Sequence, residues 1–251
     1  SNAIKVDLPD PEGPVTARAW PLATFNETSF KMVSVPDGPS TCRDTSVASK
    51  TNFVTRFLLL ALFLFGTSAG ASPPTILIIG DSISAAYGMP VEKGWVSLIQ
   101  KRLPPQTRVI DAAESGKTTS GALRILPGLL DQHRPQVVIL EIGANDGLRG
   151  HHPDVIKRNL ASMITQSMQS GAHVLMTAID IPSNYGPVYR EAFRSVYTDL
   201  AADYDIAFVP SIFDEIFLRP DLLQADGLHP NEAAQHVIAD RILPVLKTLI
   251  D

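Results

Sequence analysis

The 251-residue sequence contains a single cysteine, Cys42, and this scarcity excludes several kinds of site. One cysteine cannot form an internal disulfide, and it has no second cysteine with which to share a metal ion. The chain also lacks an excess of positive charge, because its formal net charge is −5. Proteins that bind nucleic acid usually carry a basic face, so we expect no nucleic-acid partner.

The sequence also offers no obvious membrane span. The apolar run at 57–65 is too short to cross a bilayer, which needs about 20 apolar residues. Lys50 and Arg56 precede this run and the small residues of Ala-Gly-Ala at 69–71 follow it, which is the order of a secretory signal peptide. We therefore predict a signal peptide over residues 50–71, cleaved after Ala71, and export to a bacterial periplasm. The alternative is a buried core helix.

The residues before this segment show no pattern of a folded domain. Residues 1–3, Ser-Asn-Ala, are typical of the remnant of a cleaved expression tag. Residues 4–49 contain several prolines and no sustained hydrophobic period, so we predict little stable structure there. We interpret 1–49 as this remnant followed by a disordered or mis-assigned extension. The folded domain is then expected over 72–251, without a stable membrane span and as a monomer.

Within 72–251, apolar runs rich in branched residues alternate with amphipathic stretches. This order predicts a parallel α/β sheet with helices on both faces. The runs predict strands at 75–79, 107–112, 136–142, 173–179 and 206–209. The amphipathic stretches predict helices at 92–103, 118–133, 153–170, 188–204 and 231–249, with Pro127 breaking or kinking the second and Pro244 a possible kink in the last.

Nucleotide-binding loops are missing from this pattern. Gly116-Lys117-Thr118 matches the end of a phosphate-binding loop, GxxxxGK[ST], but Asp111 stands where the first glycine is required. The first strand is followed by GDSISAAYG, which is not the GxGxxG of dinucleotide-binding folds. We therefore expect no nucleotide and no other cofactor, and Gly116 needs another explanation.

Residue types suited to acyl transfer follow the predicted strands instead. Ser82 lies after the first strand, Gly116 after the second and Asn145 after the third. Ligands bind at the carboxyl ends of such strands. His229, just before the last helix, is the candidate base for Ser82, and Asp226 is near enough to orient it. The amides of Ser82 and Gly116 and the side chain of Asn145 are candidate oxyanion donors.

The four blocks GDSIS, ESG, GAND and DGLHP resemble those of the GDSL, or SGNH, hydrolase family. GANDGLRG and IPSNYG are most similar to its periplasmic thioesterase I, lysophospholipase and arylesterase branch. The resemblance implies a flavodoxin-like α/β/α sandwich with five parallel strands. It also implies Ser82 as the nucleophile, Asp226 and His229 as the rest of the triad, and an oxyanion hole made by Ser82, Gly116 and Asn145.

Further residues are candidates for contacts with substrate. The segments GLRGHH and IPSNYG are expected to form walls of an acyl pocket, or else to be ordinary surface loops. We expect Asp81 to bond the turn backbone, and Glu141 to brace a neighbouring loop. His151-His152 lacks a third ligand nearby, so no metal site is predicted. The candidate substrate-binding residues are Asp81, Gly147, Leu148, Ile181, Pro182 and Tyr185.

The sequence therefore predicts an exported serine hydrolase of esters and thioesters that works through an acyl-enzyme. Its substrate is expected to be a small-molecule or lipid ester or thioester. Two alternatives stay open at this point. One is a carbohydrate O-acetyl esterase, and the other is a non-catalytic binding module on the same scaffold.

Overall fold

A computed structural model describes residues 73–213 and 215–250 as one α/β unit. The predicted signal peptide at 50–71 and the extension before it lie outside the described residues. Five parallel strands form one sheet in the order β2-β1-β3-β4-β5. The strands are β1 (Thr75–Gly80), β2 (Arg108–Asp111), β3 (Val137–Glu141), β4 (His173–Thr177) and β5 (Ala207–Val209).

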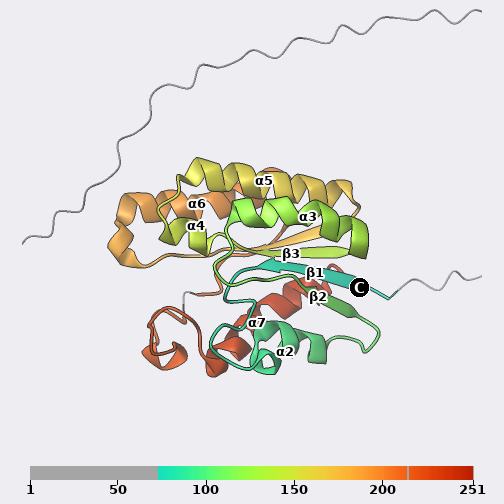
Figure 1. The fold of residues 1–251 in the computed structure, drawn as a ribbon, viewed down its shortest axis with the longest axis horizontal. Coiled ribbons are helices and arrows are strands. Elements are labelled where there is room, and N and C mark those ends of the chain that lie inside the picture. The colour runs from blue at the N-terminus through green and yellow to red at the C-terminus, as the bar shows by residue number, and fades with distance from the viewer. Residues whose placement is uncertain (1–72, 214, 251) are drawn as a thin grey trace, which may run out of the picture. The chain divides into compact units, whose positions relative to one another are not determined.

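Helices cover both faces of this sheet, which completes a three-layer sandwich (Figure 1). The helices α3 (Thr119–His133), α4 (Ala144–Leu148), α5 (Pro153–Gln169) and α6 (Pro187–Tyr204) lie on one face, and α2 (Trp95–Arg102) and α7 (Glu232–Lys247) lie on the other. Short 3₁₀ turns are η1 (Val91–Lys93), η2 (Ser183–Tyr185) and η3 (Pro220–Leu222). Among the described residues, no helix is both long and apolar enough to span a bilayer.

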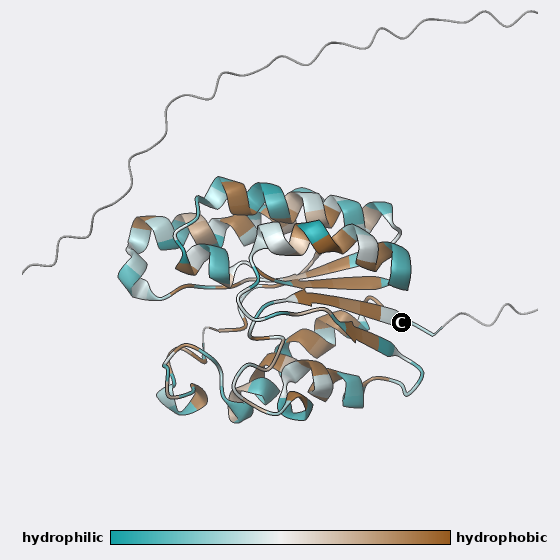
Figure 2. Ribbon diagram, in the orientation of Figure 1, coloured by the Kyte–Doolittle hydropathy of each residue, from teal (hydrophilic) through white to brown (hydrophobic). Residues whose placement is uncertain are grey.

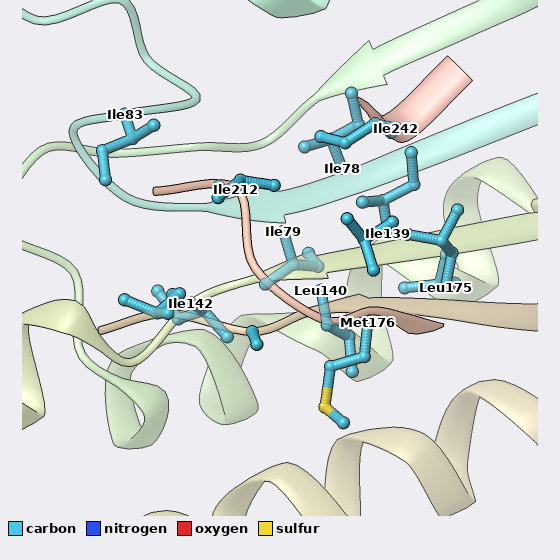
Figure 3. Close-up of a cluster of buried hydrophobic side chains, with 14 of the residues drawn as sticks. Ile78, Ile79, Ile83, Ile139, Leu140, Ile142, Leu175, Met176, Ile212 and Ile242 are labelled. Carbon is cyan, nitrogen blue, oxygen red and sulfur yellow. The ribbon is translucent and has the colours of Figure 1, made fainter. Parts of the chain in front are cut away.

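The central strands are apolar along their whole length, because both of their faces are covered (Figure 2). Every residue of β1 and of β3 is buried. Figure 3 shows Ile78 of β1 beside Ile242 of α7, while Met176 of β4 points toward the opposite helix layer. This two-sided core holds the carboxyl ends of the strands in a fixed arrangement.

The predicted fold class is confirmed, and all five predicted strands and five predicted helices are present. Two details refine the expectation. Of the two effects expected at Pro127, a break is excluded, because α3 continues to His133. Pro127 is exposed, so its ring lies on the solvent side of α3 and not in the core. The sequence also did not predict α4, a single short turn that carries Asn145.

The strand order determines which loops can meet. Strand β1 pairs with β2 on one side and with β3 on the other. The segment after β1, which contains Ser82, is therefore flanked by the segments after β2 and β3. Those two segments contain Gly116 and Asn145, so the topology brings the three residues to one edge of the sheet.

Candidate active site

Ser82 lies in the turn that follows β1. The carbonyl oxygen of Ser82 accepts a hydrogen bond from the amide of Tyr87, and that of Asp81 accepts one from the amide of Ala85, so the chain curls at once after the strand. Gly80 allows this close turn, because a Cβ atom there would lie 2.4 Å from the Ser84 hydroxyl. The turn leaves Ser82 half-buried at the carboxyl edge of the sheet.

A histidine from the far end of the sequence meets this serine. The Nε2 atom of His229 lies 3.0 Å from the Oγ atom of Ser82. On the other side of the ring, Nδ1 lies 2.7 Å from Oδ2 of Asp226. Serine, imidazole and carboxylate thus form one hydrogen-bonded row, in which the carboxylate favours the tautomer that leaves Nε2 free to accept a proton.

The Asp226 carboxylate is held in its charged form. The hydrogen bond from His229 lowers the pKa of Asp226 to about 2, and the amides of Leu228 and His229 add to this effect. Both amides donate to Oδ1, at 2.9 Å and 3.0 Å. A carboxylate with these bonds stays ionised at neutral pH and keeps its orientation toward the imidazole.

Several contacts hold the His229 loop in place. The backbone amide of Gln224 donates to the His229 carbonyl at 2.8 Å. The side-chain nitrogen of Gln224 donates to the Tyr87 carbonyl at 2.7 Å. The ring of Tyr87 also lies against the imidazole, with 4.5 Å between the two centroids. Asn231 caps α7 directly after the loop by accepting from the amides of Ala233 and Ala234. The loop is therefore tied both to the Ser82 turn and to a helix.

Donor groups stand on both sides of Ser82. Gly116 has φ +79°, a conformation that favours glycine, and Asn145 lies on the first turn of α4. Both residues line the same cavity as Ser82. Among the described residues, no hydrogen bond takes the backbone N–H of Ser82 or Gly116 as its donor.

Two buried acids lie behind the Ser82 turn. The Asp81 carboxylate accepts from the amide of Ile83 at 3.1 Å and from Nδ2 of Asn145 at 3.4 Å. Ser84 donates to Glu141 at 2.6 Å, and both carboxyl groups are fully buried. Burial raises the pKa of Asp81 to about 6, and burial together with the nearby charge of Asp81 raises that of Glu141 well above its usual value. Glu141 therefore braces the Ser82 turn, and Asp81 contacts the Asn145 amide.

A cavity of about 200 Å³ opens beside Ser82 and His229. Its walls are mainly apolar, and the rings of Phe213 and Phe217 stack at 5.2 Å between centroids. Asp180, at the edge of the cavity, is paired with the guanidinium of Arg190, whose Nε donates at 2.8 Å. The other apolar or small residues of the wall are Ile83, Ala144, Leu148, Ile179, Pro182 and Leu228.

The structure places the predicted substrate-binding residues in three different locations. Leu148 and Pro182 line the cavity. Tyr185 lines a neighbouring hollow instead, and its hydroxyl donates to the Leu148 carbonyl at 2.7 Å. Asp81, Gly147 and Ile181 are buried behind the site. A Cβ atom at Gly147 would lie 2.7 Å from Ile181, so this glycine lets α4 pack closely.

Sequence reasoning did not identify several residues of the wall. Phe213 and Phe217 come from the segment after β5, and Tyr87 comes from the end of the Ser82 turn. The four-residue spacing of the two phenylalanines, following a strand, is the signal that could have identified them. Asp146, which is buried beside Asn145, was also not predicted to have a role.

Comparisons with known sequences find a matching family and several similar proteins. Residues 78–237 match the GDSL-like lipase/acylhydrolase family. The chain is 44% identical over 194 residues to esterase TesA of Pseudomonas aeruginosa, covering 76% of this chain and 96% of the relative. It is 38% identical over 195 residues to thioesterase 1/protease 1/lysophospholipase L1 of Escherichia coli, covering 78% of this chain and 92% of the relative.

Among solved structures, the fold resembles the psychrotrophic esterase EstA from Pseudoalteromonas in a form inhibited by monoethylphosphonate. The TM-score is 0.66 and the sequence identity is 40%, and the match covers 69% of this chain and 97% of that chain. The family match over 78–237 spans both the Ser82 turn and the His229 loop.

Proposed function

The chain belongs to the GDSL-like lipase/acylhydrolase family, and from this premise we propose that Ser82, His229 and Asp226 hydrolyse carboxylic esters and thioesters through an acyl-enzyme. The observation that carries the proposal is the hydrogen-bonded row from the Ser82 hydroxyl through the imidazole to the Asp226 carboxylate. That row is the arrangement required to activate a serine nucleophile.

In the first half of the reaction, the Ser82 oxygen attacks the carbonyl carbon while its proton passes to Nε2 of His229. The imidazolium that forms is stabilised by Asp226, whose carboxylate lies 2.7 Å from Nδ1. The tetrahedral intermediate then collapses as His229 gives the proton to the leaving alcohol or thiol. An acyl group remains on Ser82.

In the second half, water takes the place of the leaving group. His229 accepts a proton from this water as its oxygen attacks the acyl carbon. Collapse of the second tetrahedral intermediate returns the proton to the Ser82 oxygen and releases the carboxylic acid. The two halves together consume one water molecule for each ester or thioester, and they return the enzyme to its starting state.

Negative charge on the carbonyl oxygen needs donors in both halves. We assign this role to the amides of Ser82 and Gly116 and to the side chain of Asn145. The flanking positions of Gly116 and Asn145 around Ser82, and the absence of other acceptors for the two amides among the described residues, support the assignment. Fixed donors of this kind contribute about 10²–10³-fold each to the rate.

The cavity indicates the class of substrate. Its apolar wall, with stacked Phe213 and Phe217, suits an acyl chain or an aryl group better than the hydroxyls of a sugar. This favours a lipid or aryl ester, or an acyl thioester, over an O-acetylated carbohydrate. The names of the relatives, an esterase and a thioesterase that is also called a lysophospholipase, support the same choice.

We further propose that the enzyme is exported after cleavage behind Ala71 and acts as a monomer. The signal-like order of residues 50–71 supports export, and the site is built from the residues of one chain. Expression of the full chain in a bacterium, followed by fractionation and N-terminal sequencing, tests the export and the cleavage site. A periplasmic product beginning at Ser72 is expected, and a cytoplasmic product that retains 50–71 would contradict it.

Labelling with a fluorophosphonate tests the central proposal. The reagent should modify Ser82, located by peptide mass spectrometry, and should abolish hydrolysis of p-nitrophenyl esters and acyl-CoA. Ser82→Ala should be folded, unlabelled and inactive, whereas Ser115→Ala, which alters another serine of the cavity, should retain both properties. Failure to label a folded wild-type protein would favour a binding module. Hydrolysis of acetylated sugars alone would favour the carbohydrate esterase.

A further inference from the structure

Asp146 is a buried acid that the proposed mechanism does not use. It directly follows Asn145 in α4, and its side chain is only 1% exposed. A carboxylate in such a place destabilises the fold unless hydrogen bonds replace the water it has lost. Its partners therefore indicate what it is for.

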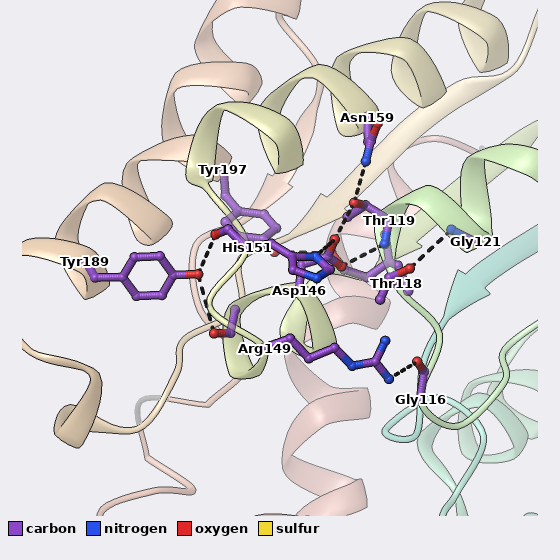
Figure 4. A network of polar contacts seen from close by, with 12 residues as sticks. Gly116, Thr118, Thr119, Gly121, Asp146, Arg149, His151, Asn159, Tyr189 and Tyr197 are labelled. Atoms are coloured by element: carbon purple, nitrogen blue, oxygen red, sulfur yellow. Dashed lines mark hydrogen bonds and ion pairs between the residues drawn. The ribbon is translucent and has the colours of Figure 1, made fainter. Parts of the chain in front are cut away.

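The partners of Asp146 come mainly from the start of α3 (Figure 4). Oδ2 accepts from the backbone amide of Thr119 at 2.7 Å, and Oδ1 accepts from the Thr119 hydroxyl, also at 2.7 Å. Nδ1 of His151 lies 3.2 Å from Oδ1. Thr119 is the first residue of α3, where the helix dipole favours a negative charge, so the carboxylate stabilises the helix start.

These bonds join the two segments that carry candidate oxyanion donors. Gly116 lies three residues before Thr119, and Asn145 is next to Asp146. A second bond links the same segments, because Nη2 of Arg149 donates to the Gly116 carbonyl at 3.1 Å. Figure 4 shows the two links between these segments, with Thr119 also receiving a bond from Asn159 of α5 at 2.9 Å.

We propose that Asp146 is a positioning residue, which sets the placement of the Asn145 amide relative to the Gly116 amide through its two bonds to Thr119. This inference rests on the proposed function, because it presumes that both amides stabilise the oxyanion. Asp146 itself touches no reacting atom. It acts by holding α4 against the start of α3.

The size of the expected effect follows from the geometry of catalysis. An oxyanion donor is effective at about 2.7–3.1 Å from the charged oxygen, and a displacement of about 1 Å can lower a rate by about 10²-fold. The substrate carbonyl carries little charge before attack, so a displaced donor weakens ground-state binding less. Loss of the Asp146–Thr119 bonds should therefore lower kcat and leave KM nearly unchanged.

A double-mutant cycle on the full chain tests the proposal. Thr119→Val removes the hydroxyl, and with it the side-chain bonds to Asp146 and Asn159, but keeps the side-chain shape. Asp146→Asn keeps the shape of the acid but replaces one of its two acceptor oxygens with an amide nitrogen. Each is made alone and together with Asn145→Ala, and kcat and KM are measured with a p-nitrophenyl ester. Each single change should lower kcat by about 10-fold to 10²-fold. In the Asn145→Ala background, the same change should have little further effect on kcat, because the Asn145 amide that Asp146 positions is gone.

A matched control separates positioning from general loss of packing. Thr165→Val also removes a threonine hydroxyl bond, to the Ala161 carbonyl within α5, and should leave kcat unchanged. If Asp146→Asn does not fold, Thr119→Val still completes the cycle. Arg149 is exposed, and Arg149→Met breaks the bond to the Gly116 carbonyl, which is the second link between the two segments. This variant is measured alongside the others as an independent test.

The outcomes distinguish this inference from the proposed function. An equal fall of kcat in both backgrounds, or a rise in KM with unchanged kcat, would overturn the positioning role while leaving the enzyme assignment intact. An unchanged kcat in both Thr119→Val and Asp146→Asn would do the same. If Asn145→Ala alone has normal kcat, the oxyanion role of Asn145 fails and the inference fails with it, although fluorophosphonate labelling of Ser82 would still support the nucleophile.

Discussion

Nε2 of His229 lies 3.0 Å from Oγ of Ser82, although 147 positions separate the two residues in the sequence. The contact joins the turn after the first strand to the loop before the last helix. Because the same imidazole lies 2.7 Å from the Asp226 carboxylate, one ring can accept the serine proton and return it to a leaving group. Changes to the groups around this ring should therefore alter the rate of reaction more than they alter the fold.

Asp226→Asn should lower kcat by about 10⁴-fold with the fold intact. The amide cannot stabilise the imidazolium, and it favours the tautomer with the proton on the wrong nitrogen. Asp226 is exposed at the surface, so thermal unfolding should change little. Steady-state kinetics and a melting curve check both parts. Asp221→Asn, at another acid of the same surface region, serves as the control, and a kcat for Asp226→Asn similar to that of this control would argue against the triad.

Asn145→Ala should lower kcat by about 10²–10³-fold with little change in KM. The amide contributes mainly when the carbonyl oxygen carries charge, which happens in the transition state. Measuring kcat, KM and Tm on one preparation separates this from a structural role. A nearly normal kcat with a raised KM would remove Asn145 from the oxyanion hole and leave the amides of Ser82 and Gly116 as the donors.

Asp81→Asn should become more stable relative to the wild type as the pH rises. Burial raises the pKa of Asp81 to about 6 in the folded protein, from 3.8 in an unperturbed chain. The folded state therefore binds more protons than the unfolded state between these values, and the wild type loses stability as the pH increases through them. Asparagine carries no charge at any of these pH values, so the variant does not share this loss.

The measurement for this prediction is the difference in Tm between Asp81→Asn and the wild type at about pH 4 and at about pH 8, on either side of the range over which the stability changes. The difference should shift in favour of the variant at the higher pH. Asp131→Asn makes the same chemical change at an exposed position of α3 and should show no comparable shift. A Tm difference for Asp81→Asn that stays constant with pH would show that folding does not raise the pKa of this carboxyl.

Gly143→Ala should destabilise the protein by about 1–3 kcal/mol. Gly143 has φ +127°, and a Cβ atom there would lie 2.1 Å from the Tyr197 hydroxyl, which donates to the Ile142 carbonyl at 3.2 Å. Both the backbone conformation and the space oppose a side chain. The free energy of unfolding in urea provides the measurement.

Gly128→Ala is the matched control for this substitution. Gly128 lies in α3, and a Cβ atom added there would have no atom within 4 Å apart from its chain neighbours and the adjacent helix backbone. Alanine should therefore raise the free energy of unfolding by about 0.5–1 kcal/mol, because it favours the helix more than glycine does. Equal effects at the two glycines would contradict the steric argument.

Because Gly143 immediately precedes α4, a fall in kcat is also expected for Gly143→Ala.

The sequence by itself determined the order of the elements and the residues that meet at the sheet edge. Apolar runs and amphipathic periods are local properties, and they predicted every strand and every long helix. In a parallel sheet the carboxyl ends of neighbouring strands lie together. The positions of Ser82, Gly116 and Asn145 in the segments that follow three strands therefore predicted a shared site.

Only the tertiary structure decided which side chains build the walls and supports of that site. Phe213 and Phe217 line the cavity because the segment after β5 folds back over it, and their four-residue spacing alone does not encode that path. Asp146 finds Thr119 27 residues earlier because α4 packs against the start of α3. Such contacts depend on how helices pack against each other, and that packing is set by the shapes of side chains that are distant in sequence.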